Sequence, residues 1–75
     1  MAELVEYLAR KLVDDPEAVR VEQEERDGSI VLHLHVAPDD VGKVIGRQGR
    51  VVRALRTLVR ASAVRSRRRV LLEIA

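Results

Sequence analysis

The hydrophobic positions along the chain follow two periods, and each period predicts one kind of element. Apolar residues recur every three or four positions in residues 3–13 and 50–65, as they do in amphipathic helices. Apolar and polar residues alternate in residues 18–26, 29–37 and 70–74, as they do in strands. A short helix is predicted over residues 38–45 because a proline and two acids begin it.

The resulting order is helix, strand, strand, helix, helix, strand, which favours one two-layer α+β domain over residues 1–75. We expect a three-stranded sheet with three helices covering one face. Asp27-Gly28 predicts a tight hairpin between the first two strands. The residues predicted to face inward from the two long helices are Leu4, Val5, Leu8, Leu12, Val13, Val51, Val52, Leu55, Leu58 and Val59. The central strand is predicted to turn Ile30, Leu32, Leu34 and Val36 inward, and Val31, His33 and His35 outward.

The link between the last two helices carries the most informative pattern, Val-Ile-Gly-Arg-Gln-Gly-Arg over residues 44–50. Gly46 and Gly49 tolerate positive φ angles, and because they lack a β-carbon another backbone can come close. A phosphate is the natural group to do so, since the first turn of a helix offers unpaired amides at its positive end. The amides predicted to fill this role are those of Gly49, Arg50 and Val51. The link therefore predicts a clamp for a nucleic-acid backbone.

The two halves of the chain carry opposite charge. Residues 1–40 hold four basic residues against eleven acids, whereas residues 41–75 hold ten basic residues against one acid. This division favours one basic face for a polyanion, although a dipolar surface that only maintains solubility would show the same balance. Twelve of the fourteen basic residues are arginine and asparagine is absent, which fits either a hot habitat or a GC-rich genome. The run Arg65–Arg69 fits a soluble turn better than a specific site, although it could add distant phosphate contacts.

Other kinds of site find little support. No acid is placed with a nucleophile or base partner, so the sequence predicts no catalytic residues and no enzyme. His33 and His35 share one strand face, but no third ligand is evident, so we expect no metal and no cofactor there. An open sheet face or a partner interface fits this pair better. The chain lacks cysteine, an apolar run of membrane-spanning length and a signal peptide, which favours a cytoplasmic protein without membrane contact.

At residues 44–49 the sequence resembles a KH domain, whose signature is an apolar residue, isoleucine and Gly-x-x-Gly between two helices. The element order resembles the type II, or prokaryotic, KH arrangement. The resemblance covers nearly the whole chain. Its length and the run from Val36 to Arg50 are similar to the small bacterial stand-alone KH proteins of the KhpA family.

The resemblance implies single-stranded RNA binding, with the loop clamping the backbone of about four nucleotides. The RNA-binding residues that it implies are Lys43, Val44, Ile45, Gly46, Arg47, Gln48, Gly49, Arg50 and Arg53. The glycines would shape the loop, and the two residues between them would contact phosphate or sugar. The two apolar residues before the loop would form the floor under the bases, and the three other basic residues would flank it. Val36 and the end of the second strand would form the opposite wall.

The family also suggests an RNA chaperone or post-transcriptional regulator that pairs with itself or with a larger KH-containing, Jag-type RNA-binding protein. Two alternatives stay open. The same loop and helices could form a dimerisation module in which RNA contact is incidental, or the ligand could be single-stranded DNA. Tyr7 is the only aromatic residue, so base stacking on aromatic platforms is not expected and sequence preference should be loose.

Overall fold

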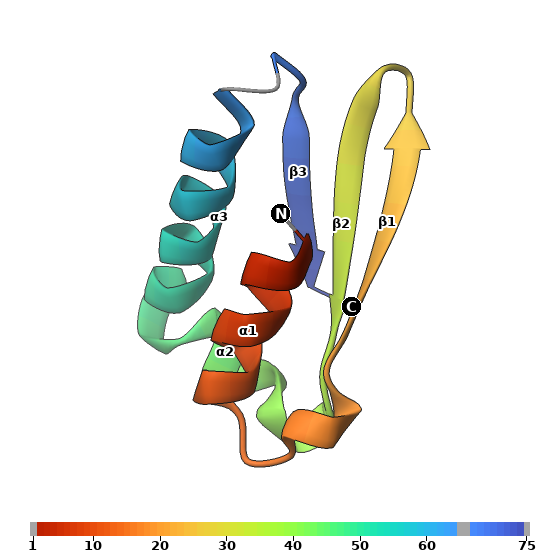
Figure 1. Ribbon diagram of the computed structural model, residues 1–75. Helices are drawn as coiled ribbons and strands as arrows, with labels where there is room; N and C mark the ends of the chain where they lie inside the picture. Colours follow the sequence, from red (N-terminus) through yellow and green to blue (C-terminus); the bar gives the residue numbers. More distant parts are fainter. Residues whose placement is uncertain (1, 65–66, 75) are drawn as a thin grey trace.

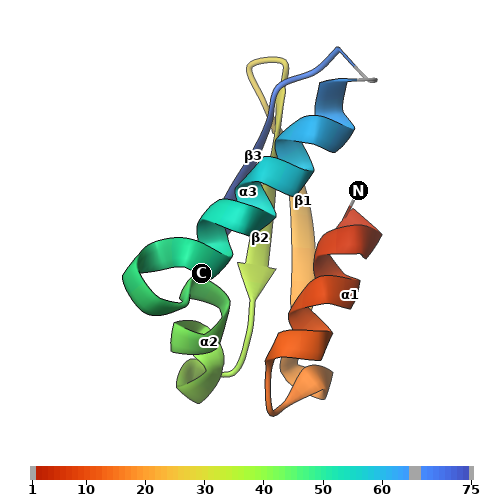
Figure 2. The same ribbon diagram turned by 90° about the vertical axis from the view of Figure 1, so that its left-hand side faces the viewer.

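The computed structural model of the chain describes residues 2–64 and 67–74 and consists of a helical layer packed on a sheet (Figure 1). The main elements are α1 (Ala2–Leu12), β1 (Arg20–Arg26), β2 (Ser29–His35), α2 (Val41–Ile45), α3 (Arg50–Ala63) and β3 (Val70–Ile74). Between them lie the 3₁₀ turns η1 (Pro16–Ala18), η2 (Pro38–Asp40) and η3 (Arg47–Gly49). The three helices lie on one side of the sheet, as the sequence predicts (Figure 2).

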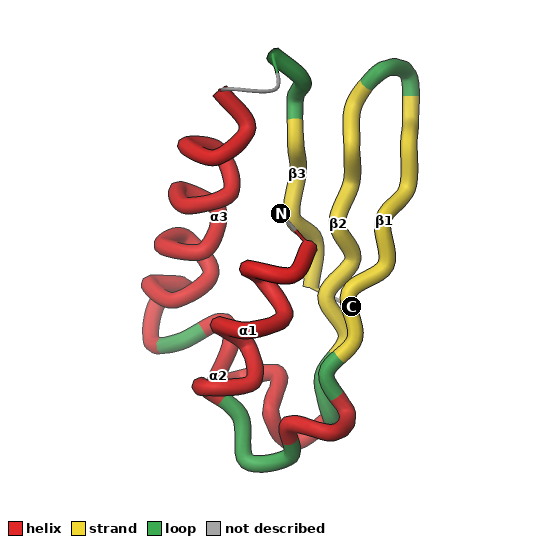
Figure 3. Tube along the Cα trace, in the orientation of Figure 1, coloured by secondary structure: helices red, strands yellow, loops and turns green. Residues whose placement is uncertain are grey.

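The sheet has the order β1-β2-β3, with β2 in the centre. β1 and β2 are antiparallel and meet at the predicted Asp27-Gly28 turn, where both residues have positive φ angles of 52° and 81°. Such a turn matches the right-handed twist of the strands. β2 and β3 are parallel, so the chain between them crosses the helical face through α2 and α3 (Figure 3). This crossover places β3 at the sheet edge beside α3.

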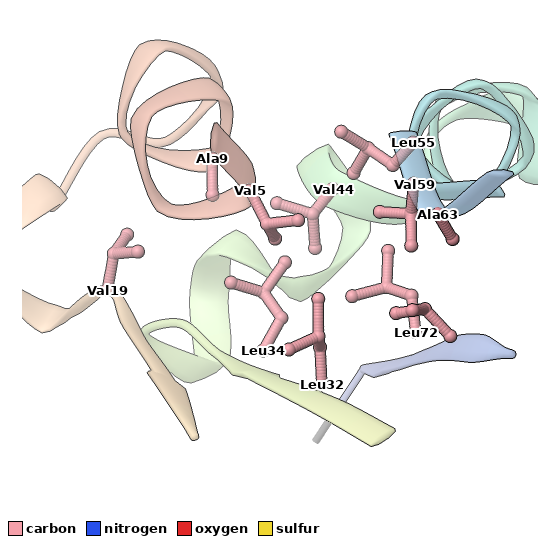
Figure 4. Packing of buried hydrophobic residues seen from close by; sticks show 11 residues of the cluster. Val5, Ala9, Val19, Leu32, Leu34, Val44, Leu55, Val59, Ala63 and Leu72 are labelled. Atoms are coloured by element: carbon pink, nitrogen blue, oxygen red, sulfur yellow. The ribbon is translucent and has the colours of Figure 1, made fainter. Parts of the chain in front are cut away.

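The core lies between the two layers, where β2 contributes its fully buried Leu32 and Leu34 (Figure 4). The remaining buried members of the cluster are Val5, Ala9, Val19, Val44, Leu55, Val59, Ala63, Val70 and Leu72. Burial of a Val or Leu side chain contributes about 1.5–3 kcal/mol to stability. Because every helix supplies part of this small core, the positions of α2 and α3 are set by the same packing that stabilises the domain.

The helical stripes bury fewer residues than the sequence predicts. In α1, Ala9 is 0% exposed, whereas Leu4 and Leu12 are each 39% exposed. A small residue at position 9 lets α1 come close to its neighbours, and the flanking leucines then fall at the edge of the contact. Leu58 of α3 is also exposed. The two predicted apolar stripes therefore extend beyond the core onto the surface.

Element boundaries differ from the predictions in small ways. The helix predicted over residues 38–45 is divided into the turn η2 and the helix α2. The last helix was expected to reach residue 65, which lies outside the described residues, and α3 ends at Ala63. Val31, expected on the open sheet face, is only 1% exposed because it lies on the central strand, with Glu24 and Leu71 as its partners in register. None of the helices within residues 2–64 and 67–74 is long and apolar enough to cross a membrane.

Candidate nucleic-acid interface

The predicted link forms a tight turn between α2 and α3, at the lower left of Figure 2. Three of its four residues have positive φ angles: Gly46 at 76°, Gln48 at 57° and Gly49 at 74°. For Gln48 this left-handed conformation is strained, since its β-carbon crowds the backbone. Strain of this kind persists only where the surrounding structure holds it, and it is concentrated at functional sites.

Position 46 requires glycine for two reasons. Its ψ angle of 173°, combined with a positive φ, lies in a region that essentially only glycine occupies. A β-carbon at this position would also overlap the side chain of Val51 and lie 2.9 Å from the Val51 amide nitrogen. The contact brings the end of α2 directly against the first turn of α3.

Two of the three amides predicted to be unpaired, those of Gly49 and Arg50, have main-chain acceptors. The amide of Gly49 donates a hydrogen bond to the Gly46 carbonyl at 3.1 Å, and the amide of Arg50 donates to the Arg47 carbonyl. The turn η3 thus satisfies donors that a bare helix start would leave free. Within the described part of the chain, the amides of Arg47 and Gln48 have no main-chain acceptor. The donors available to an anion therefore lie at the tip of the link.

The side chains at the tip are exposed, and two of the three are basic. Arg47, Gln48 and Arg50 all face solvent, and no acid among residues 2–64 and 67–74 pairs with either arginine. Arg53 lies one turn further along α3, and its Nη2 donates a hydrogen bond to the carbonyl oxygen of Gln48. That bond supports the strained residue, so Arg53 positions the loop in addition to carrying charge beside it.

Lys43 has structural partners that the sequence did not predict. Its ammonium group pairs with the carboxylates of Asp14 and Asp40, the latter at 3.3 Å. The hydrogen bond from Lys43 to Asp14, and then that to Asp40, raises the pKa of the lysine. Two carboxylates already compensate this charge, so Lys43 contributes less to an anion site than Arg47 or Arg50.

Asp40 connects α2 to the chain that follows α1. Asp40 is 2% exposed, and its carboxylate accepts hydrogen bonds from the amides of Asp14 at 3.2 Å and Asp15 at 3.0 Å. Burial acts to raise the pKa of Asp40, but the bonds from these two amides and from Lys43 outweigh it and hold the pKa below its ordinary value. The ionised carboxylate thus holds the N-terminal end of α2 in place.

The apolar residues expected beside the loop divide between core and surface. Val44 is 0% exposed and belongs to the core, so its predicted place on the groove floor is wrong. Ile45 is 37% exposed and can offer a surface to a base. Val36 packs against the core, and the strand beside α3 is the edge strand β3 rather than β2. The opposite wall is therefore expected from β3.

The two histidines on the open sheet face pair with acids of β1. Nε2 of His33 lies 2.9 Å from Oε1 of Glu24, and Nε2 of His35 lies 2.8 Å from Oε1 of Glu22. The hydrogen bond from His33, followed by that from Arg26, lowers the pKa of Glu24. Within the described residues no group of three or more His, Cys, Asp or Glu side chains could hold a metal ion.

The comparison with known families shows the family of the chain. A family model described as "KhpA/KhpB, KH domain" matches residues 2–74. The chain belongs to this family. The protein named RNA-binding protein KhpA from Caldanaerobacter subterraneus subsp. tengcongensis is 51% identical over 74 residues, which cover 99% of both chains. The protein of the same name from Treponema pallidum is 54% identical over 72 residues, 96% of this chain and 90% of its own. Membership of the KhpA/KhpB KH family confirms the resemblance stated from residues 44–49.

The three glycines in α2 and in the link between α2 and α3 should respond differently to alanine. Gly42→Ala should stabilise the domain by up to about 1 kcal/mol, because this helical position has open space. Gly49→Ala should cost about 1–2 kcal/mol for its left-handed φ angle. Gly46→Ala should cost at least about 3 kcal/mol, because the backbone penalty adds to the overlap with Val51. Urea denaturation followed by circular dichroism measures all three, and equal costs at Gly46 and Gly49 would contradict the close contact.

Removal of the Asp40 charge should make the free energy of unfolding less dependent on pH in the acidic range. The folded pKa of Asp40 is lowered below 3.8, so its ionised form stabilises the fold above that pH. The difference in free energy of unfolding between the wild type and Asp40→Asn should be constant near neutral pH. It should shrink as the pH falls below 3.8 through the folded-state pKa. Asp39→Asn, at the exposed neighbouring position, is the matched control. A difference that did not change with pH would refute the role of the carboxylate.

Proposed function

We propose that the chain is a non-enzymatic, single-stranded RNA-binding protein whose loop Gly46–Gly49 holds the sugar–phosphate backbone. The observation that carries the proposal is the tip of this loop. Within the described residues, Arg47 and Arg50 pair with no acid there, and the amides of Arg47 and Gln48 have no main-chain acceptor. Guanidinium groups and main-chain amides are the usual ligands of phosphate oxygens. The family and the names of its curated members, RNA-binding protein KhpA, support the same ligand.

Backbone contacts should dominate over base recognition. The only aromatic ring, Tyr7, lies on α1, where the Lys11 ammonium is 5.3 Å from the ring centre. Bases would therefore rest on aliphatic surface such as that of Ile45, and sequence preference would be loose. With two to four phosphates held, the logarithm of affinity should fall with the logarithm of salt concentration with a slope of roughly −1.4 to −2.8.

The double replacement Arg47→Asp with Gln48→Asp should abolish RNA binding without unfolding the domain. Both side chains are exposed, and aspartate tolerates the left-handed conformation of residue 48 better than most residues. Fluorescence anisotropy with an unstructured oligoribonucleotide measures the affinity, and circular dichroism checks the fold.

Arg20→Asp with Gln23→Asp is the matched control, since it makes the same two changes at exposed positions of β1. Unchanged RNA affinity in the loop variant, or equal loss in both variants, would refute the assignment. A matched DNA oligomer tests the runner-up ligand, because a site that uses the 2′-hydroxyl should bind RNA more tightly.

The surface also favours self-association as a second function. An apolar groove of about 350 Å³ lies between α1 and α3, and we call it the α1–α3 groove. Its lining consists of Leu8, Lys11, Leu12, Arg50, Val51, Ala54, Leu55 and Leu58. The occupant we propose is a second copy of the chain. α1 carries acids at its start and Arg10 and Lys11 at its end, so two antiparallel copies of this helix would be complementary in charge.

Leu58→Arg should convert such a dimer to a monomer, because the substitution places a charge in the α1–α3 groove. Sedimentation equilibrium at increasing protein concentration measures the change. Leu71→Arg is the control, since Leu71 is an exposed leucine on β3, outside this groove. A wild-type protein that is monomeric throughout, or a dimer that persists in Leu58→Arg, would contradict the assignment. A dimer that RNA dissociates or does not affect would favour the dimerisation module over RNA binding.

The biological setting follows from this pair of functions. Two linked loops on one transcript would bind more tightly than one, because the second contact is intramolecular. Loose sequence preference and avidity suit an RNA chaperone or post-transcriptional regulator acting in the cytoplasm. A larger Jag-type protein with its own KH domain could replace the second copy, and mixed sedimentation of the two proteins would detect it.

A further inference from the structure

One ion pair close to the loop joins an acid from the first half of the chain to the lysine of α2. Lys43 lies three residues before Gly46, which is about 4.5 Å along the helix axis. Its ammonium group donates hydrogen bonds to Asp14, which lies between α1 and η1, and to Asp40. The tertiary fold thus holds a carboxylate beside the helix that leads into the loop.

The two acids of this cluster differ in burial and in partners. The side chain of Asp40 is 3% exposed, and it accepts hydrogen bonds from two main-chain amides in addition to Lys43. The side chain of Asp14 is 80% exposed, and within the described residues it pairs with Lys43 alone. An exposed ion pair contributes little to stability, because water and salt screen it. Asp40 therefore has the structural role, and the fold does not require the Asp14 carboxylate.

The Asp14 carboxylate makes the cluster negative, since one ammonium group then faces two carboxylates. An ammonium group has three donors, and the two acids occupy two of them. A phosphate that approaches Lys43 would be repelled by Asp14 and would have to displace its hydrogen bond. Without that acid, the flexible stem of Lys43 would present its charge to a phosphate, and Asp40 would keep its two amide donors.

We propose that Asp14 limits the affinity of the loop for RNA by competing with phosphate for Lys43. The inference rests on the proposed function, because it assumes a sugar–phosphate backbone at Gly46–Gly49. The competitor is an anion, as is the phosphate it excludes, and it pairs with the one basic residue that α2 contains. The loop consequently holds fewer phosphates than its basic surroundings would allow, and it releases RNA more readily.

Asp14→Asn tests the proposal, because it keeps the shape of the side chain and removes its charge. Lys43 should gain one phosphate contact, so the log–log salt slope for an unstructured oligoribonucleotide should become steeper by roughly 0.7. Compared with the wild type, affinity should rise about eightfold at ~0.05 M salt and about threefold at ~0.2 M, because the contribution of one counterion vanishes only near ~1 M. Fluorescence anisotropy across a salt series measures both quantities, and circular dichroism checks the fold.

Two further variants separate competition at Lys43 from a general loss of negative charge. Asp15→Asn removes the same charge at the neighbouring exposed position, whose carboxylate pairs with no lysine in the described part of the chain. Its salt slope should equal that of the wild type. Asp14→Asn combined with Lys43→Gln should have the same slope as Lys43→Gln alone, because the group that Asp14 holds is then absent.

The outcomes distinguish this inference from the proposed function. If the wild type binds no RNA, or if Arg47→Asp with Gln48→Asp leaves binding unchanged, the proposed function fails and the role of Asp14 fails with it. If that loop variant loses binding but Asp14→Asn has wild-type affinity and slope, RNA binding stands and the role of Asp14 is wrong. An equal gain in Asp15→Asn, or a gain that persists beside Lys43→Gln, would also overturn it.

Discussion

The contact between Gly46 and Val51 determines how α2 meets α3, and the candidate site depends on that junction. Each helix is held separately by the core, α2 through Val44 and α3 through Val52 and Leu55. The short link between them therefore has few available paths, and only a residue without a β-carbon permits the one observed. The side chains and amides at the tip of the loop face solvent as a consequence, because the packed helices on either side occupy the interior.

A second constraint acts at the other end of α2. The buried carboxylate of Asp40 joins this end to the amides of Asp14 and Asp15, and Lys43 completes the cluster. Acids of the first half of the chain thus serve structure near α1, while the unpaired arginines of the second half lie along α3 and its loop. The charge division seen in the sequence therefore corresponds to two regions of the fold, an acidic one near α1 and a basic one along α3 and its loop.

Much of the fold could be predicted from the sequence, because the relevant signals are local. Alternation identified β2 and β3, helical periodicity identified α1 and α3, and Asp27-Gly28 identified the hairpin. The burial of Val44 could not be predicted in the same way, since an apolar residue beside a loop suits a core and a ligand floor equally well. The exposure of Leu4 likewise depends on Ala9, whose small side chain sets how closely the helix packs.

The turn between α2 and α3 was predicted in its position but not in its hydrogen bonding. Two glycines at fixed spacing indicate a link, but the 3₁₀ turn that satisfies the amides of Gly49 and Arg50 depends on the dihedral angle of Gln48, which sequence does not reveal. The partners of Lys43 come from 29 and three residues away. Such contacts arise from tertiary packing, so no local sequence pattern predicts them.

The central claim is that the tip of the Gly46–Gly49 loop holds an RNA backbone through amides and guanidinium groups. Amide NMR shifts measured while a short, unstructured oligoribonucleotide is added test it most directly. The account predicts that the largest changes occur at Arg47, Gln48 and Arg50, and that the exposed sheet face around His33 and His35 stays unchanged. Saturable binding that leaves the amides of residues 43–53 unmoved would contradict it.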